Sequence, residues 1–196
     1  MYPFFKRLLD AGLALALTLL TAPLIGLLCV LIRLDSPGKA IFAQWRVGKG
    51  HRLFRMYKLR TMKVGAERET DLLIEEGEIF VQRQEDPRLT RLGKLLRRTS
   101  LDELPQLWNV LRGEMALVGP RPLVLGEMNR LPPVALERLD VRPGITGYAQ
   151  AEGRSDADAV ERISRDLYYV RNLSLRLDLR ILLHTAGTVW RREGSF

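Results

Sequence analysis

The chain has 196 residues, enough for one compact domain with a membrane element but too few for two full hydrophobic cores. Its 31 Lys and Arg residues against 23 Asp and Glu residues give a net charge of +8, so we expect anionic partners: phospholipids, phosphorylated substrates or nucleic acid. The one cysteine, Cys29, excludes an intrachain disulfide, and nothing in the composition requires an oxidising compartment.

The first element is an apolar segment from Ala11 to Ile32 without a charged side chain. As a helix it would cover about 33 Å, close to the roughly 30 Å hydrocarbon thickness of a bilayer. Pro23 removes a helical hydrogen bond near its middle, a defect usually seen as a kink. Basic residues, which favour the cytoplasmic side, flank both ends: Lys6, Arg7, Arg33 and Lys39. Residues 1–39 therefore form either a straight membrane span or a re-entrant helix that bends at Pro23 and returns.

The remaining residues, 40–196, are predicted to form a membrane-associated catalytic domain. Segments 40–46 and 52–59 mix aromatic, aliphatic and basic residues in near alternation, and the glycines of 47–51 suit a turn between them. This pattern predicts a β-hairpin over about 40–60. The strongly charged segment 65–86 is predicted to be a mobile surface excursion, part of it helical.

Between Pro87 and Ser100, basic residues recur at helical spacing against leucines: Arg88, Arg91, Lys94, Arg97 and Arg98. The pattern predicts an amphipathic helix. Its leucines could lie in the membrane interface or pack on an ordinary core, and the preceding apolar segment favours the interface.

Further helices are expected at 103–112, ended by Gly113, and at 123–140, interrupted by Pro132 and Pro133. The segment 141–147 reads as a loop, and another helix is expected over 155–171. The C-terminal leucines alternate like a strand at 173–179, but a helical pattern persists longer, to Trp190. The predicted fold class is mainly α with a short β-hairpin.

Two adjacent carboxylates, Asp102 and Glu103, stand before a predicted helix. Ser100 with Glu103 fits a capping box, which is common without catalysis. Pro105 places both carboxylates in the first helical turn, where the helix dipole favours ionised groups and free N–H groups can receive phosphate. Asp102 could therefore attack phosphorus, and both carboxylates could bind Mg²⁺, which would reduce the repulsion between two anions. The spacing alone leaves the capping and the catalytic interpretations open.

Several ordered motifs resemble one family. They are YKLRTM at 57–62, SLDELPQLWNVLRGEM at 100–115, VGPRP at 118–122 and VRPGITG at 141–147. Together these motifs resemble the bacterial sugar transferases, and specifically the small monotopic polyprenol-phosphate phosphoglycosyl transferases of the minimal catalytic-core type.

The resemblance implies a re-entrant membrane helix and amphipathic interfacial helices around a catalytic core on the cytoplasmic face of the bacterial inner membrane. It also implies a two-step reaction. Asp102 would attack the β-phosphate of a UDP-sugar, releasing UMP, and polyprenol (undecaprenyl) phosphate would then take the phosphosugar from the enzyme. Glu103 would bind Mg²⁺ or assist proton removal from the acceptor phosphate.

The family pattern also implies a set of phosphate and nucleotide contacts: Lys58, Arg60, Arg97, Arg121, Arg142, Gln150 and Arg154. Arginine suits this role because its planar fork binds phosphate oxygens in pairs. For Arg142 a surface or headgroup contact is the stronger alternative.

The chain departs from the family pattern in three places. Ala22 precedes Pro23 where the family commonly has serine, so Thr18 or Thr21 could satisfy the freed backbone instead. Tyr148 and Ser155 stand where tryptophan and asparagine are frequent, near the presumed sugar pocket, and the identity of the sugar stays open.

One rival interpretation is a non-catalytic, membrane-anchored basic scaffold protein. A nucleic-acid-binding protein is disfavoured, because the basic residues alternate with leucines rather than with exposed aromatics. The expected partners are therefore a UDP-sugar, a polyprenol phosphate and the phospholipid bilayer. Self-association is a further expectation, because the predicted hairpin has an exposed edge.

Overall fold

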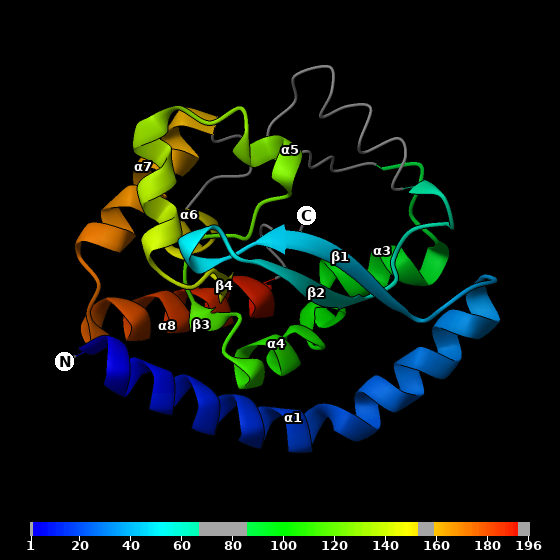
Figure 1. Ribbon diagram of the computed structural model, residues 1–196. Helices are drawn as coiled ribbons and strands as arrows, with labels where there is room; N and C mark the ends of the chain where they lie inside the picture. The colour runs from blue at the N-terminus through cyan, green and yellow to red at the C-terminus, as the bar shows by residue number, and fades with distance from the viewer. Residues whose placement is uncertain (1, 67–85, 153–158, 192–196) are drawn as a thin grey trace.

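The computed structural model describes residues 2–66, 86–152 and 159–191. The charged segment predicted at 65–86 lies almost entirely outside these residues, and so do Arg154 and Ser155. The described part is mainly helical with a short β-hairpin, which confirms the predicted fold class (Figure 1).

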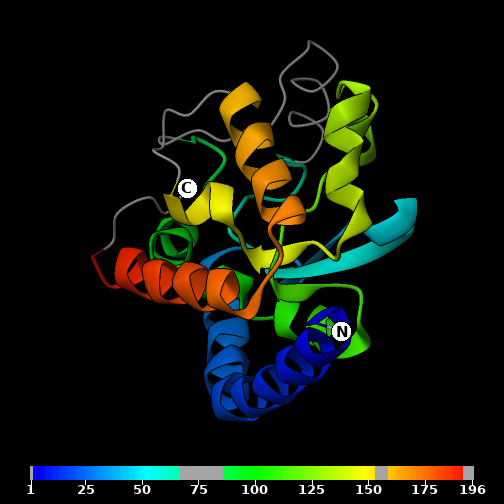
Figure 2. The ribbon, with the colours of Figure 1, turned by 90° about the vertical axis from the view of Figure 1, so that its left-hand side faces the viewer.

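The N-terminal helix α1 (Tyr2–Asp35) runs along one side of the molecule as a single 34-residue helix that contains Pro23. Among the described residues it is the one helix long and apolar enough to cross a membrane. It is bent, and Figure 2 shows its two limbs as a V. The Thr18 and Thr21 hydroxyls donate to the carbonyls of Ala14 and Leu17, contacts that often bend helices. Neither bonds the Leu19 carbonyl that Pro23 leaves free, so the predicted substitution for serine is wrong.

One face of α1 packs on the rest of the protein. The buried residues follow helical spacing: Asp10, Ala14, Leu28 and Ile32. Most of the other leucines are exposed, with Leu19 at 70% and Leu20 at 77%. Such a large apolar surface indicates contact with lipid or with another protein.

Both ends of α1 are bonded to the same body. Near its start, the Arg7 guanidinium donates to the carbonyls of Val110 and Leu111 at 2.6 and 2.8 Å. Near its end, Arg60 donates to the carbonyls of Pro37 and Ser36 at 2.6 and 2.7 Å. These bonds satisfy carbonyls at helix C-termini, which otherwise lack partners. Arg60 is therefore an anchor of α1 and lies outside the site for which it was predicted.

The predicted hairpin is confirmed. Strands β1 (Ile41–Val47) and β2 (Leu53–Leu59) pair antiparallel, from Ile41 opposite Leu59 to Val47 opposite Leu53. The turn between them contains a short 3₁₀ helix, η1 (Lys49–His51), with an exposed His51. Lys58, near the end of β2, is thereby carried to the centre of the molecule.

Helix α3 (Arg91–Arg98) is shorter than predicted and begins at Thr90, whose hydroxyl accepts from the Gly93 N–H. Leu96 is fully buried in a cluster with Leu28 and Ile32 of α1. The expectation that the leucines of this helix lie in the membrane interface is therefore wrong for Leu96, because α1 and the hairpin cover it.

The carboxylates lie on a separate 3₁₀ turn, η2 (Leu101–Glu103), which precedes helix α4 (Gln106–Arg112). Ser100 has a left-handed backbone conformation (φ 54°) and its side chain caps nothing, so the capping-box interpretation is wrong. Pro105 is the residue before α4, which places both carboxylates ahead of that helix rather than within its first turn. Gly113 ends α4 with φ 77°, as predicted.

A second, parallel strand pair was missed by the sequence analysis. Strand β3 (Ala116–Val118) pairs with β4 (Gly144–Thr146), which was predicted to be a loop. Gly144 is required there, because a Cβ atom would lie 2.1 Å from the backbone nitrogen of Gly119. Between the strands, the predicted helix 123–140 is two pieces: α5 (Leu125–Met128) and the 3₁₀ helix η3 (Pro133–Asp140).

Three helices complete the body: α6 (Tyr148–Glu152), α7 (Ala159–Arg171) and α8 (Leu175–Arg191). The C-terminal segment is thus a helix, as its longer pattern predicted. Ile181 of α8 and Tyr169 of α7 pack with Val118 of β3. In Figure 2, α8 projects to one side above the limbs of α1.

Candidate active site

The η2 turn places Asp102 and Glu103 beside cationic side chains from three other segments. Lys58 of β2 donates to a Glu103 carboxylate oxygen at 2.7 Å, and Arg121 lies 4.0 Å from the same oxygen. Arg97, in the last turn of α3, is close enough for its charge to act on both carboxylates. Asp102 is only 6% exposed, and within the described ranges it forms no ion pair. Positive charge therefore surrounds two carboxylates, of which Asp102 is buried and Glu103 is hydrogen-bonded to Lys58.

The two carboxylates differ in acidity although they are adjacent. Burial raises the pKa of Asp102 to about 6, and the charge of Lys58 only partly opposes this shift. Burial also disfavours the charged form of Glu103, but the cations Lys58 and Arg121 outweigh it and hold the pKa of Glu103 below its usual value. Two neighbouring carboxyl groups whose pKa values are shifted in opposite directions are typical of active sites in which the two groups have different roles.

A small cavity with several polar side chains adjoins Glu103. Its charged and amide side chains are Arg46, Lys58, Glu103, Gln106, Arg121 and Gln150. Burial lowers the pKa of Lys58, although Glu103 counteracts the effect. The excess of cationic side chains around Glu103 favours an anionic group such as a phosphate, although the cavity itself has a volume of only about 10 Å³, room for one water-sized group.

The loop that carries Arg121 is held by two arginines, the buried Arg138 and the partly buried Arg46. Arg138 donates to the Arg121 carbonyl at 2.9 Å and pairs with Asp166 of α7 at 2.5 Å. Arg46 donates to the Pro122 carbonyl at 3.2 Å. These contacts fix the loop from both sides, so the Arg121 guanidinium is presented from a rigid support.

Most of the contacts predicted from the family pattern come together here. Lys58, Arg97, Arg121 and Gln150 surround the carboxylates or line the adjoining cavity. Arg142 does not, because its guanidinium donates to the Gly113 carbonyl at 2.8 Å, where α4 ends.

The sequence analysis missed three residues: Arg46, Gln106 and Arg138. Gln106 lies within the 100–115 motif, three residues after Glu103, and this position was the available signal. No local pattern distinguishes Arg46 and Arg138 from surface residues, since the tertiary fold brings both to the site.

Asp102 and Glu103 are candidate ligands for Mg²⁺. Within the described residues, no group of three or more His, Cys, Asp and Glu side chains could hold a metal ion. Mg²⁺, however, commonly uses one or two carboxylates together with substrate phosphates and water. Asp102 and Glu103 fit that pattern, although Lys58 already occupies one oxygen of Glu103.

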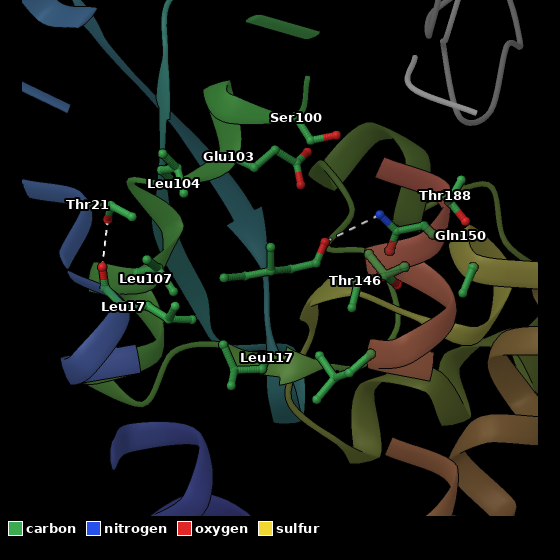
Figure 3. A pocket seen from close by; sticks show the side chains of 14 residues that line it. Leu17, Thr21, Ser100, Glu103, Leu104, Leu107, Leu117, Thr146, Gln150 and Thr188 are labelled. Atoms are coloured by element: carbon green, nitrogen blue, oxygen red, sulfur yellow. Dashed lines mark hydrogen bonds between the residues drawn. The ribbon is translucent and has the colours of Figure 1, made fainter. Parts of the chain in front are cut away.

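A second, larger cavity lies on the other side of Glu103. Figure 3 shows the Glu103 carboxylate directed into it, with Leu17 and Thr21 of α1 on one wall and Thr188 of α8 opposite. Its remaining lining is mainly aliphatic and includes Leu107 and Leu117. Glu103 thus stands between a cationic and an apolar space, while Asp102, the buried residue before it, lines neither.

The amino-acid sequence is similar to those of known sugar transferases. The model of a family described as bacterial sugar transferase matches residues 1–192. The chain is 41% identical over 200 residues to a UDP-N-acetylgalactosamine-undecaprenyl-phosphate N-acetylgalactosaminephosphotransferase of Aeromonas hydrophila, across 99% of this chain and 45% of that protein. It is 42% identical over 201 residues to a UDP-glucose:undecaprenyl-phosphate glucose-1-phosphate transferase of Caulobacter vibrioides, across 97% of this chain and 72% of that protein.

A third relative has nearly the same length as the chain. This is the exopolysaccharide production protein PSS of Rhizobium leguminosarum bv. phaseoli, 42% identical over 202 residues, across 97% of this chain and 98% of that protein. By contrast, the chain spans less than half the length of several other relatives, including the Aeromonas hydrophila protein.

Proposed function

The chain belongs to the bacterial sugar transferase family, and on that premise we propose that it moves a sugar 1-phosphate from a UDP-sugar to polyprenyl phosphate. The observation that carries the proposal is the carboxylate pair on η2, whose environment raises one pKa and lowers the other beside a cationic cavity. Relatives whose names contain undecaprenyl phosphate and a UDP-sugar support this choice of substrates.

In the first step, the Asp102 carboxylate attacks the β-phosphorus of the UDP-sugar. An O–P bond forms while the bond from the β-phosphorus to the bridging oxygen breaks, and UMP leaves with the electron pair. With a pKa of about 6, Asp102 is mostly ionised at neutral pH yet is more basic than an exposed carboxylate. Lys58, Arg97 and Arg121 offset the negative charge of the diphosphate as the anions approach.

In the second step, a phosphate oxygen of the acceptor attacks the same phosphorus. The bond to Asp102 breaks and returns the carboxylate, and the product is a polyprenyl diphosphosugar. Glu103 is a weak base near neutral pH because nearby cations lower its pKa. We therefore assign Glu103 to electrostatic and metal-binding roles rather than to proton removal.

Mg²⁺, when bound, would supply further neutralisation of phosphate charge, and Asp102 and Glu103 are the side chains that would hold it. Lys58 orients Glu103 through its 2.7 Å hydrogen bond, and Arg121 lies 4.0 Å from the same carboxylate oxygen.

The protein is proposed to sit on the cytoplasmic face of the bacterial inner membrane with α1 as a re-entrant element. A straight 34-residue helix would be about 51 Å long and would place its ends on opposite sides of the bilayer. Instead, Arg7 and Arg60 bond both ends of α1 to one body that carries buried charges. This contact pattern, together with the bend, supports entry and exit through the same face.

The decisive experiment detects the covalent phosphosugar. The purified protein is incubated with UDP-sugars and Mg²⁺ without acceptor, and intact mass and peptide mapping locate the adduct. We expect an adduct on Asp102 with release of UMP, and Asp102→Asn should lose both. Asp140→Asn, which changes an exposed aspartate, is the matched control and should retain both. A requirement for both substrates before any UMP appears would contradict the two-step route.

A further inference from the structure

The apolar cavity beside Glu103 has no role in the chemistry described above. It encloses about 300 Å³, a size found among small-ligand pockets. Aliphatic side chains come to it from α1, α4, β3 and α8, and they include Leu17, Leu107, Leu117 and Leu182. A space of this kind favours a hydrocarbon ligand, because burying apolar surface away from water is favourable.

The apolar cavity and the cationic cavity share part of their walls. Glu103, Ile145 and Gln150 line both. The Gln150 side-chain amide donates a hydrogen bond to the Ile145 carbonyl at 3.4 Å, shown by the dashed line in Figure 3. A ligand with a phosphate head and an apolar chain would thus meet cations at its head and leucines along its chain.

The cavity is also adjacent to the surface that we expect to meet lipid. Leu17 and Thr21 form its α1 wall, while Leu20 of the same helix is 77% exposed. Leu182 belongs to the α8 wall, and Leu183, the next residue, is 75% exposed. Two walls of the cavity therefore belong to helices that also expose leucines on their outer surfaces, which suits a ligand whose remaining chain stays in the bilayer.

We propose that this cavity binds the isoprenyl units nearest the phosphate of the polyprenyl acceptor. The inference rests on the proposed function and adds to it a binding site for the hydrocarbon chain of the acceptor. Binding there holds the acceptor phosphate at the Glu103 end of the cavity, while the cationic side chains Lys58, Arg97 and Arg121 attract the donor diphosphate. Head and chain are thus recognised by different surfaces of the same site.

Photocrosslinking tests the location directly. Polyprenyl phosphate with a diazirine on the isoprenyl unit nearest the phosphate is irradiated with the full chain in phospholipid nanodiscs. We expect adducts on peptides that contain Leu107 and Leu182, removed by excess unlabelled polyprenyl phosphate and unaffected by added phosphatidylethanolamine. Adducts confined to outward residues such as Leu20 would overturn the inference, and so would competition by phosphatidylethanolamine, since the cavity would then hold phospholipid.

A pair of variants on α8 adds a kinetic test. Thr188 lines the cavity, and its hydroxyl bonds only within its own helix among the described contacts, so Thr188→Phe should fill the space without breaking the site. Excluding about two methylene groups should raise the KM for polyprenyl phosphate by about tenfold. UMP release from the donor alone should stay unchanged. Ala186→Phe, on an exposed position of the same helix, should change neither.

The two proposals fail in different ways. If no UDP-sugar yields product with the wild-type protein, the proposed function falls, and this inference falls with it. If product forms but Thr188→Phe and Ala186→Phe give the same acceptor KM, only the place assigned to the acceptor chain is wrong.

Discussion

Two buried charged clusters in this protein have opposite characters. The anchor cluster joins α1 to α7 and α8 and consists of Tyr2, Lys6, Asp10, Tyr169 and Asp178. The active-site cluster consists of Lys58, Arg97, Asp102, Glu103 and Arg121. Both are largely withdrawn from water, and the second borders the two cavities described above.

The anchor cluster is internally satisfied. Asp178 accepts from Lys6 at 2.7 Å and from the Tyr2 hydroxyl, and the Tyr169 hydroxyl lies 2.7 Å from its other oxygen. Lys6 also lies 3.2 Å from Asp10. The anchor cluster thus has one cation for two carboxylates, whereas in the active-site cluster three cations face two carboxylates. Buried charge with complete partners holds helices together, whereas an excess of cations beside a cavity can bind an anion.

The largest effect on activity within this comparison, short of removing the nucleophile, is expected from Lys58→Met. The variant removes the donor to Glu103 and one charge beside the diphosphate, and we expect kcat to fall by about 10²–10³-fold with the fold retained. Lys49→Met, in the exposed hairpin turn, is the control and should be near wild type. Wild-type turnover by Lys58→Met would show that this cation does not take part in catalysis.

Asp178→Asn should act on stability instead. It leaves Lys6 buried without its closest carboxylate, and breaking a buried ion pair costs about 3 kcal/mol of the free energy of unfolding. Denaturant unfolding in micelles measures the loss, and kcat of the protein that remains folded should be close to wild type. A fall in kcat without any loss of stability would mean that the anchor cluster belongs to the site.

The different origins of the two clusters explain what the sequence could predict. The long apolar helix, the hairpin and the helix ended by Gly113 depend on local patterns, and all were predicted. The carboxylates and Arg121 lie in motifs that carry the family resemblance. Arg46, Arg138 and the parallel β3–β4 pair depend on contacts between distant segments, such as Arg138 with Asp166, and no local period encodes them.

The same reasoning explains why some local predictions were wrong. Ser100 fits a capping box, but in the connection between α3 and η2 it takes a left-handed conformation and its side chain makes no cap hydrogen bond. Leu96 lies on a helix with the pattern of a membrane-surface helix, yet α1 covers it. In both cases the local pattern is present in the sequence, but tertiary packing determines a different structure.

The variant Arg121→Lys tests whether Arg121 acts through its positive charge alone or also through the planar shape of its guanidinium group. The positive charge remains, but the planar fork that can hold two phosphate oxygens is lost, and we expect kcat/KM for the UDP-sugar to fall about tenfold. Arg112→Lys, at a half-exposed position at the end of α4, is the control and should have no effect. Equal kinetics for the two variants would indicate that Arg121 acts only as a point charge.

The smallest effect is a pH-dependent gain in stability from Asp102→Asn. The folded-state pKa of Asp102 is raised by burial to about 6 from an ordinary 3.8, so folding favours its protonated form. The stability that this provides is complete below pH 4 and is lost as the pH rises through about 6. Asparagine carries no such cost, so the variant should melt a few degrees above wild type at pH 8 and together with it at pH 4. Asp140→Asn should show no such trend. A constant difference in melting temperature would mean that Asp102 does not ionise against a burial cost, which would remove the physical reason for assigning it as the nucleophile.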